Sequence, residues 1–167
     1  MKIKVLFLVC IVLLLINILY VSAESECKNI NFDGLRIKGD LKDYLIKVNV
    51  APEEDLEVKE LKIVNKIDED LPVIVEVNLY NIDKDQNVET IKLDSVEINA
   101  RDFKKFNFTL KVPKGIDENE RYNLQVKVYE NREEPKNCDE KNTMININSK
   151  YKSGFFKRLI GWFGNII

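Results

Sequence analysis

Short stretches in which apolar and polar side chains alternate recur through the middle of this chain, and turn-rich segments such as residues 130–142 separate them. Alternation with a period of two is typical of β-strands with one buried face, because successive side chains point to opposite sides of the backbone. Helical spacing of apolar residues is nearly absent from residues 40–149. About seven such stretches at near-regular spacing predict an all-β, antiparallel β-sandwich.

The alternation also predicts which side chains each strand turns toward the core. The stretch 56–65 alternates in two halves that slip near Glu60, so we expect a β-bulge at this point. In the stretch 71–81 we expect Glu76 and Asn78 to point outward. The side chains predicted to point inward are Tyr44, Ile46, Val48, Val50, Val73, Val75, Val77, Leu79, Phe106, Phe108, Leu110, Val112, Tyr122, Leu124, Val126, Val128, Thr143, Ile145 and Ile147.

The first 23 residues carry the parts of a secretory signal peptide. Lys2 and Lys4 precede a long apolar run that only Asn17 interrupts, and the run ends at the small residue Ala23. We therefore predict export, with cleavage after Ala23. Because the run approaches the roughly 18 residues of a membrane span, an uncleaved hydrophobic helix is the alternative. Either outcome places the chain after residue 23 outside the cell or at its surface.

Cys27 and Cys138 are the two cysteines outside this apolar segment, one near each end of the exported body. In an oxidising compartment such a pair predicts an internal disulfide. Closing so long a loop stabilises a fold by about 4–5 kcal/mol in the chain-entropy model. Two unpaired thiols, or a bridge to another chain, are the alternatives.

Two runs of the sequence resemble a known family. LEVKELKIVNKIDEDLPVIVEVNLYN and FNFTLKVPKGIDENERYNLQVKVYE are followed by a cysteine in an acidic loop before a last strand. Over residues 40–148 this resembles the immunoglobulin-like (CARDB-like) domains of archaeal cell-surface and surface-layer proteins. The resemblance implies an extracellular immunoglobulin-like sandwich that spaces, packs or binds, with no catalytic residues to transfer. Because such domains often occur in tandem and surface-layer subunits are usually larger, it implies an S-layer-like accessory envelope protein.

The residue types that common enzyme chemistry needs are missing or poorly placed. The chain has no histidine, which removes the commonest general base and the commonest metal ligand. Its carboxylates cluster in polar turns, where charge is normally solvated. We therefore expect a protein that is not an enzyme and holds no cofactor. Residues 24–149 contain 28 acidic and 20 basic residues, and this net charge of −8 argues against nucleic acid as a partner.

Two short motifs indicate candidate surface sites. Asp83, Asp85 and Asn87 lie near the ligand positions of a calcium loop, but Val88 occupies the position where such a loop needs glycine. We therefore predict a hairpin turn, with calcium binding as the alternative. The sequon NFT that begins at Asn107 is a candidate N-glycosylation site in an exported chain, and the alternation predicts that Asn107 faces solvent.

Residues 150–167 carry four basic residues and no acidic one. As a helix from about Gly154, this tail would place large apolar side chains on one half and basic ones on the other. A helix of roughly 20 Å is too short to cross a membrane core of about 30 Å but suits the membrane interface. Docking onto the sandwich is the alternative. The residues predicted to contact a membrane or a partner are Phe155, Phe156, Lys157, Arg158, Leu159, Ile160, Trp162, Phe163, Ile166 and Ile167.

The sequence thus predicts three parts: a signal peptide or anchor (residues 1–23), a sandwich (residues 24–149) and a basic amphipathic tail helix (residues 150–167). The first functional hypothesis is a noncatalytic cell-surface module for adhesion, envelope scaffolding or assembly, which the tail holds at a membrane surface or on an envelope protein. The alternative is a secreted protein that binds a small ligand or an ion. Its tail would then contact a partner or a second copy of the chain in a homo-oligomer.

Overall fold

The computed structural model describes Cys27, residues 34–133 and residues 135–151 of the 167-residue chain. This part contains nine β-strands, more than the seven predicted, because alternation over two or three residues cannot reveal the short strands. No helix in it is long and apolar enough to span a membrane. The elements are β1 (Leu35–Ile37), η2 (Leu41–Tyr44, a 3-10 helix), β2 (Asn49–Val50), β3 (Asp55–Asn65), β4 (Leu71–Asn81), β5 (Gln86–Lys92), β6 (Val96–Ile98), β7 (Phe103–Lys111), β8 (Tyr122–Glu130), β9 (Cys138–Ile147) and η3 (Ser149–Tyr151, a 3-10 helix).

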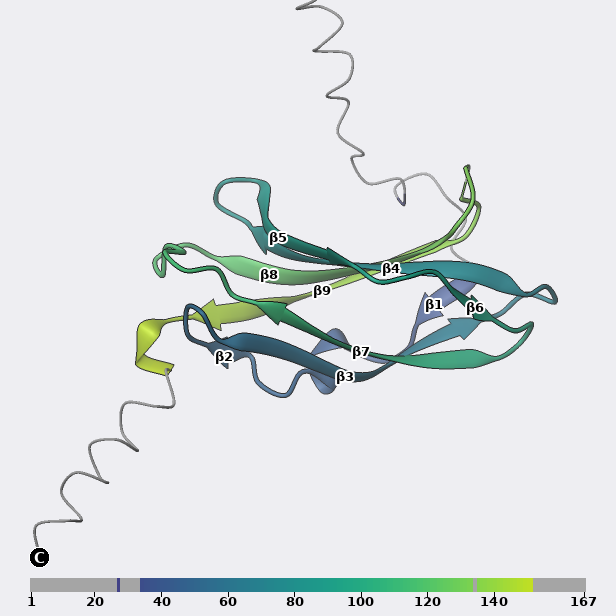
Figure 1. Ribbon diagram of the computed structural model, residues 1–167, viewed down its shortest axis with the longest axis horizontal. Helices are drawn as coiled ribbons and strands as arrows, with labels where there is room; N and C mark the ends of the chain where they lie inside the picture. The colour runs from purple at the N-terminus through teal and green to yellow at the C-terminus, as the bar shows by residue number, and fades with distance from the viewer. Residues whose placement is uncertain (1–26, 28–33, 134, 152–167) are drawn as a thin grey trace, which may run out of the picture.

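The strands form two sheets, which Figure 1 shows as two layers. One sheet has three strands in the order β1-β3-β7. The other has the order β2-β9-β8-β4-β5, with β6 also paired to β4. Neighbouring strands are antiparallel, except that β2 runs parallel to β9. The predicted all-β class is therefore confirmed.

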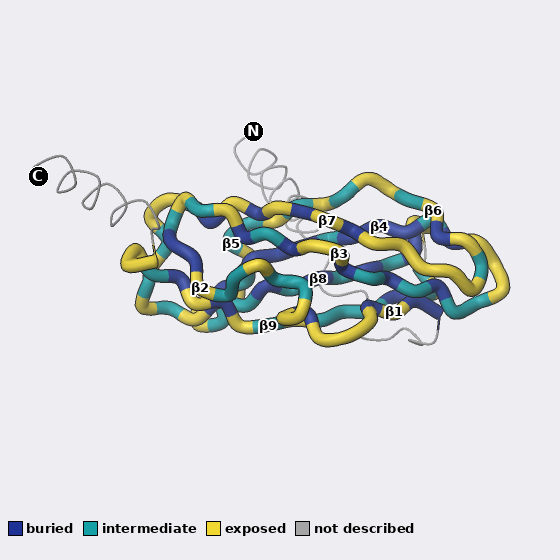
Figure 2. Tube along the Cα trace, turned by 90° about the horizontal axis from the view of Figure 1, so that it is seen from below, coloured by how far each residue is buried: buried dark blue, intermediate teal, exposed yellow. Residues whose placement is uncertain are grey.

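The core lies between the two sheets and takes apolar side chains from both of them. Figure 2 shows the resulting pattern along the long strands, where buried segments alternate with more exposed ones. The predicted inward faces of β4, β7 and β8 are all buried, and so are Ile145 and Ile147 of β9, whereas Thr143 is half-buried. Burial of these apolar surfaces is the main term that stabilises the fold.

The strand predicted around residues 44–50 is wrong in most of its length. Its first part is the 3-10 helix η2, the strand is reduced to β2, and Ile46 is 57% exposed. Asp40 precedes η2 and accepts a hydrogen bond from the Lys42 N–H at 3.1 Å, while Asp43 accepts one from the Asp40 N–H at 3.4 Å. This capping box satisfies backbone donors locally and favours a helical turn up to Tyr44, after which an irregular segment leads to the short β2.

The β-bulge predicted near Glu60 is confirmed. The pairing of β3 with β7 shifts between Val58 and Leu61, and Glu60 has a φ of 57°. The Glu60 N–H donates to Asn107 Oδ1 on β7 at 2.7 Å, so the side chain of Asn107 replaces a backbone acceptor. The inserted residue lets both halves of β3 keep their apolar side chains on the core face.

β4 has neighbouring strands on both edges, and more of its side chains are buried than its alternation predicts. It lies between β8 on one edge and β5 and β6 on the other. Asn78, which was expected to point outward, is fully buried. Thr90 Oγ1 donates to Asn78 Oδ1 at 2.6 Å, and Asn78 Nδ2 donates to Glu76 Oε1 at 3.0 Å. The buried amide is tolerated because neighbouring side chains satisfy it.

The segment 130–142, predicted to be a turn, contains the start of a strand. β9 begins at Cys138, which lies opposite Tyr129, and its antiparallel pairing with β8 runs back to Tyr122. Asp139 of β9 also accepts a hydrogen bond from the Ile37 N–H of β1 at 2.7 Å, across the two sheets. Pairing with β8 supplies order that the polar composition of this segment does not predict.

Candidate functional site

Much of the predicted contact surface lies outside the described residues. The ten tail residues between Phe155 and Ile167 are among these, and so is the predicted signal peptide of residues 1–23. Two residues of the predicted tail are described: Lys150 and Tyr151 belong to η3, which has no buried residue. The tail's contacts therefore remain a prediction.

A disulfide joins Cys27 to Cys138, which are 111 positions apart in the sequence, with the two Cα atoms 5.6 Å apart. Both residues are buried. Cys138 is the first residue of β9, so the bridge fixes the segment that precedes the sandwich to the sheet. A covalent link of this kind restricts the unfolded chain and stabilises the fold.

Asn107, the predicted glycosylation site, is exposed on β7. Its neighbours Phe106 and Phe108 are buried, as the alternation predicts. Its Oδ1 accepts the hydrogen bond from the Glu60 N–H in the bulge, and a glycan would join its Nδ2 instead. The geometry leaves the side chain on the surface, and its glycosylation remains a prediction.

The acidic segment considered for calcium forms the hairpin between β4 and β5. Asp83 is occupied by Arg121, whose Nε lies 2.8 Å from Asp83 Oδ1 and whose backbone N–H donates to Oδ2 at 2.7 Å. The Tyr80 hydroxyl donates to Asp85. Within the described residues no three His, Cys, Asp or Glu side chains gather in an arrangement that could hold a metal ion.

A network of side chains, here called the corner cluster, links this hairpin to the start of β8. It comprises Asn81, Asp83, Lys84, Asp117, Glu120, Arg121 and Tyr122. Lys84 Nζ lies 2.7 Å from Glu120 Oε1, and Asn81 Nδ2 donates to Glu120 Oε2 at 2.5 Å. The hydrogen bond from Lys84 lowers the pKa of Glu120, and that from Arg121 lowers the pKa of Asp83. Every charge mentioned here has an opposite partner close by.

Tyr122 is the buried centre of the corner cluster. It is the first residue of β8, and its hydroxyl donates to the carbonyl oxygen of Asp117, five residues earlier, at 2.9 Å. The hydroxyl also lies 3.2 Å from Glu120 Oε2. Burial, with the nearby Glu120 carboxylate, raises the pKa of Tyr122 to about 12. The residue therefore ties the loop before β8 to the core.

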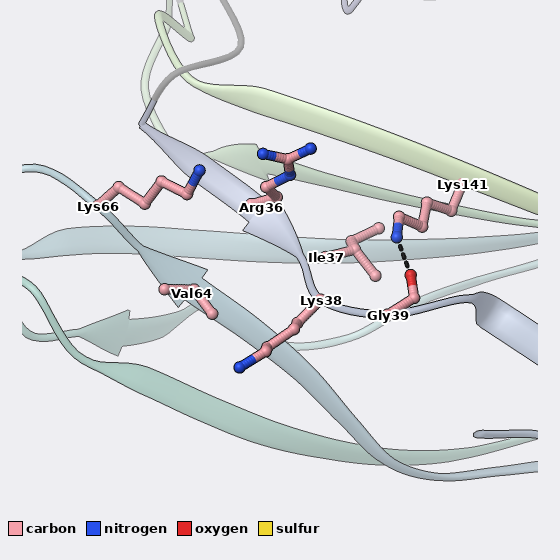
Figure 3. Close-up of a pocket in the computed structure, with 7 residues that line it drawn as sticks. All are labelled: Arg36, Ile37, Lys38, Gly39, Val64, Lys66 and Lys141. Carbon is pink, nitrogen blue, oxygen red and sulfur yellow. Dashed lines mark hydrogen bonds between the residues drawn. The ribbon is translucent and has the colours of Figure 1, made fainter. Parts of the chain in front are cut away.

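A second charged region, here called the basic hollow, has a different character. It has a volume of about 440 Å³ and is lined by Arg36, Lys38, Lys66 and Lys141, with Ile37, Gly39 and Val64. In Figure 3 the charged ends of Arg36 and Lys66 point toward one another, and the Lys141 ammonium reaches the carbonyl oxygen of Gly39. Among the described residues, none of the four cations forms an ion pair.

The basic hollow could not be read from the sequence, because its cations come from distant positions. Arg36 pairs with Val64 across β1 and β3, whereas Lys141 approaches from β9 in the other sheet. The sequence signal is weak: Arg36 and Lys38 alternate with Ile37, but Asp33 and Asp40 flank the stretch.

No protein-family model and no curated protein matches the chain. Among solved structures the chain is similar to a calcium-binding mutant of Bacteroides uniformis beta-glucuronidase 2, at 16% identity and a TM-score of 0.44. This match covers 68% of the present chain and 13% of that chain. A glycosyl hydrolase family 2 member from Bacteroides cellulosilyticus is similar at 15% identity and a TM-score of 0.41, over 67% of this chain and 14% of its own. The present chain thus spans only a small part of those enzymes' length.

Proposed function

We propose that this protein is a noncatalytic, exported cell-surface module with an immunoglobulin-like sandwich, held at the membrane surface by residues 150–167. Its role would be adhesion, envelope scaffolding or assembly, and its closest functional class would be the accessory envelope proteins of the CARDB-like type. The proposal combines the architecture of the described body with the charge and apolar pattern of the tail sequence.

The strand order supports the immunoglobulin-like part of this proposal. Sheets of the order β1-β3-β7 and β9-β8-β4-β5 correspond to strands A-B-E and G-F-C-C′ of such sandwiches. Tyr122 adds a second similarity, because immunoglobulin-like domains often carry a tyrosine near the start of strand F whose hydroxyl bonds to backbone a few residues upstream. Here the hydroxyl donates to the Asp117 carbonyl oxygen.

The observation that carries the membrane part is that the body builds its core from its own strands. Among the described residues, the core cluster takes its members from positions 35–147, and η3 at the end of the described part contributes none, with Tyr151 43% exposed. A tail with one apolar face and basic residues opposite is suited to an anionic membrane surface. The disulfide is consistent with export to an oxidising compartment.

Vesicle flotation of the full chain tests the proposal. The informative variant carries Phe155→Ser, Trp162→Ser and Phe163→Ser, which removes apolar contact area from the tail. The matched control carries Phe103→Ser, which removes a 45% exposed aromatic side chain from the body instead. We expect the wild type and the control to float with vesicles that contain anionic lipid, and the tail variant to stay behind. Equal flotation of all three would reject the tail as the anchor.

The alternative, a secreted protein for a small ligand or an ion whose tail contacts a partner or a second copy, has one observation in its favour. The basic hollow offers a concave surface lined by four cations that form no ion pair within the described part of the chain. If the wild type does not float and instead sediments as an oligomer that the tail variant abolishes, this alternative replaces the membrane proposal.

A further inference from the structure

The basic hollow concentrates positive charge on a body that is otherwise acidic. Residues 24–149 carry a net charge of −8, yet the described residues that line this hollow include four cations and no acidic side chain. Other described cations form ion pairs with acids, as in Lys47 with Glu54 and Arg101 with Asp68. Like charges held close together repel one another, so an arrangement of this kind favours a bound anion.

The cations are held by strands and by contacts far apart in the sequence. Arg36 lies in β1 opposite Val64 of β3, and Lys66 directly follows β3, where its backbone N–H donates to the Gly34 carbonyl oxygen at 2.7 Å. The ammonium of Lys141 donates to the carbonyl oxygen of Gly39. Placement on paired strands reduces the ordering cost of binding a ligand.

The acid adjacent to this region is engaged with the backbone. Asp139, two positions before Lys141 on β9, accepts the hydrogen bond from the Ile37 N–H at 2.7 Å. Asp40 and Asp43 are engaged in capping η2. Asp139, Asp40 and Asp43 therefore make hydrogen bonds to the backbone, and none of them forms an ion pair with the cations of the hollow in the described part of the chain.

We propose that the basic hollow binds a phosphate- or sulfate-type oxyanion group. A tetrahedral oxyanion presents several charged acceptor oxygens, which matches a guanidinium fork and ammonium groups that approach from different strands. The volume of about 440 Å³ leaves room for such a group together with a small substituent. This inference goes beyond the proposed function, because it requires neither export nor the tail.

Isothermal titration calorimetry of the full chain in a neutral detergent tests the inference with inorganic phosphate, inorganic sulfate and, as a control anion, chloride. The informative variant is R36Q/K66Q. The matched control is K111Q/K114Q, which removes two exposed cations that line no part of the hollow. We expect saturable binding of phosphate or sulfate, weakened at least about tenfold in R36Q/K66Q and unchanged in the control, since hydrogen bonds between charged groups are stronger than neutral ones. R36K/K66R, which keeps both charges, should retain most of the affinity.

A second arm distinguishes a free anion from a lipid phosphate. Vesicles of phosphatidylcholine, with and without phosphatidylglycerol, are tested in the F155S/W162S/F163S background, so that the tail does not dominate. Binding that needs phosphatidylglycerol and falls in R36Q/K66Q but not in K111Q/K114Q identifies a lipid headgroup. Binding of inorganic phosphate or sulfate alone identifies a free anion.

The inference is overturned if R36Q/K66Q and the control pair behave alike in both arms, or if the wild type binds neither probe. Unfolding midpoints show whether each variant is folded. If R36Q/K66Q does not fold, the single variant Lys38→Gln takes its place, because Lys38 is exposed and its side chain makes no ion pair among the described residues. The same criteria then apply to that variant.

Discussion

The corner cluster and the basic hollow use charge in opposite ways. At the end where β4 turns into β5 and the chain enters β8, the corner cluster pairs Arg121 with Asp83 and Lys84 with Glu120 around the hydroxyl of Tyr122. Toward the other end, the disulfide supplies the long-range link and the basic hollow gathers four cations without an ion pair in the described part of the chain.

The difference separates charges that serve the fold from charges that do not. Paired side chains in the corner cluster hold two loops against the sheet. Substitutions that remove these side chains should therefore lower the free energy of unfolding. The cations of the basic hollow have no ion-pair partner among the described residues, and the disulfide supplies a covalent link at that end of the fold. This contrast makes the hollow, and not the corner cluster, the better candidate for binding.

Removal of the disulfide should have the largest effect. The two cysteines are 111 positions apart, so the disulfide closes a long loop. The C27S/C138S variant should therefore lose about 4 kcal/mol of unfolding free energy. Denaturant unfolding measures the loss, and hydrogen exchange locates it. We expect faster exchange in β1 and at the start of β9, with the corner cluster little changed. Faster exchange confined to the corner cluster would contradict the proposed difference between the two regions.

Tyr122→Phe should have the next largest effect, a loss of about 1–3 kcal/mol, because the Asp117 carbonyl oxygen and the Asn81–Glu120 pair lose a buried partner. Tyr151→Phe is the matched control, since this tyrosine is 43% exposed. Denaturant unfolding of both variants checks the prediction. Equal unfolding free energies of Tyr122→Phe and Tyr151→Phe would mean that the hydroxyl of Tyr122 does not stabilise the corner cluster.

Raising the pH should weaken the contribution of Tyr122 to the stability of the fold. Burial raises the pKa of Tyr122 from 10 to about 12, so the folded protein holds this proton more tightly than the unfolded chain does. The resulting stability is fully present below about pH 10 and is lost as the pH rises through about 12. The stability difference between the wild type and Tyr122→Phe should therefore narrow over this range in pH-dependent unfolding curves. A constant difference would contradict the assignment.

Asp83→Asn should have the smallest effect, because the ion pair with Arg121 is exposed to solvent. The hydrogen bond from Arg121 lowers the pKa of Asp83 from 3.8. A lowered pKa contributes stability that is present above pH 3.8 and is lost as the pH falls through the folded-state value. We expect the wild type to lose more stability on acidification than Asp83→Asn does. The opposite order would show that Arg121 does not stabilise the charged form.

Alternation along single strands was sufficient to predict the parts of the fold that depend on one strand and one face. Val75 of β4, Phe106 of β7 and Leu124 of β8 are buried as predicted, and the slip at Glu60 is a bulge. What depends on neighbours could not be predicted in this way. Asn78 is buried because β5 lies beside β4, and Ile46 is exposed in the irregular segment between η2 and β2.

The two charged regions differ in the same respect. The corner cluster has a local sequence signal, because Tyr122 begins a strand and lies five residues after Asp117. The alternation by itself predicts Tyr122 only as a core residue. The basic hollow has almost none. Arg36, Lys66 and Lys141 become neighbours only when β1 pairs with β3 and the two sheets pack together. Sequence patterns predict such sites poorly because they carry no information on contacts between distant strands.

The free energy of unfolding of the tail variant F155S/W162S/F163S, measured without membranes, tests most directly whether the strands complete their own core and leave the tail to contact something else. The account predicts a value within about 0.5 kcal/mol of the wild type, as is usual for substitutions outside a packed core. A loss of about 3 kcal/mol or more, typical of truncating buried aromatic side chains, would place the tail against the sandwich and contradict the account.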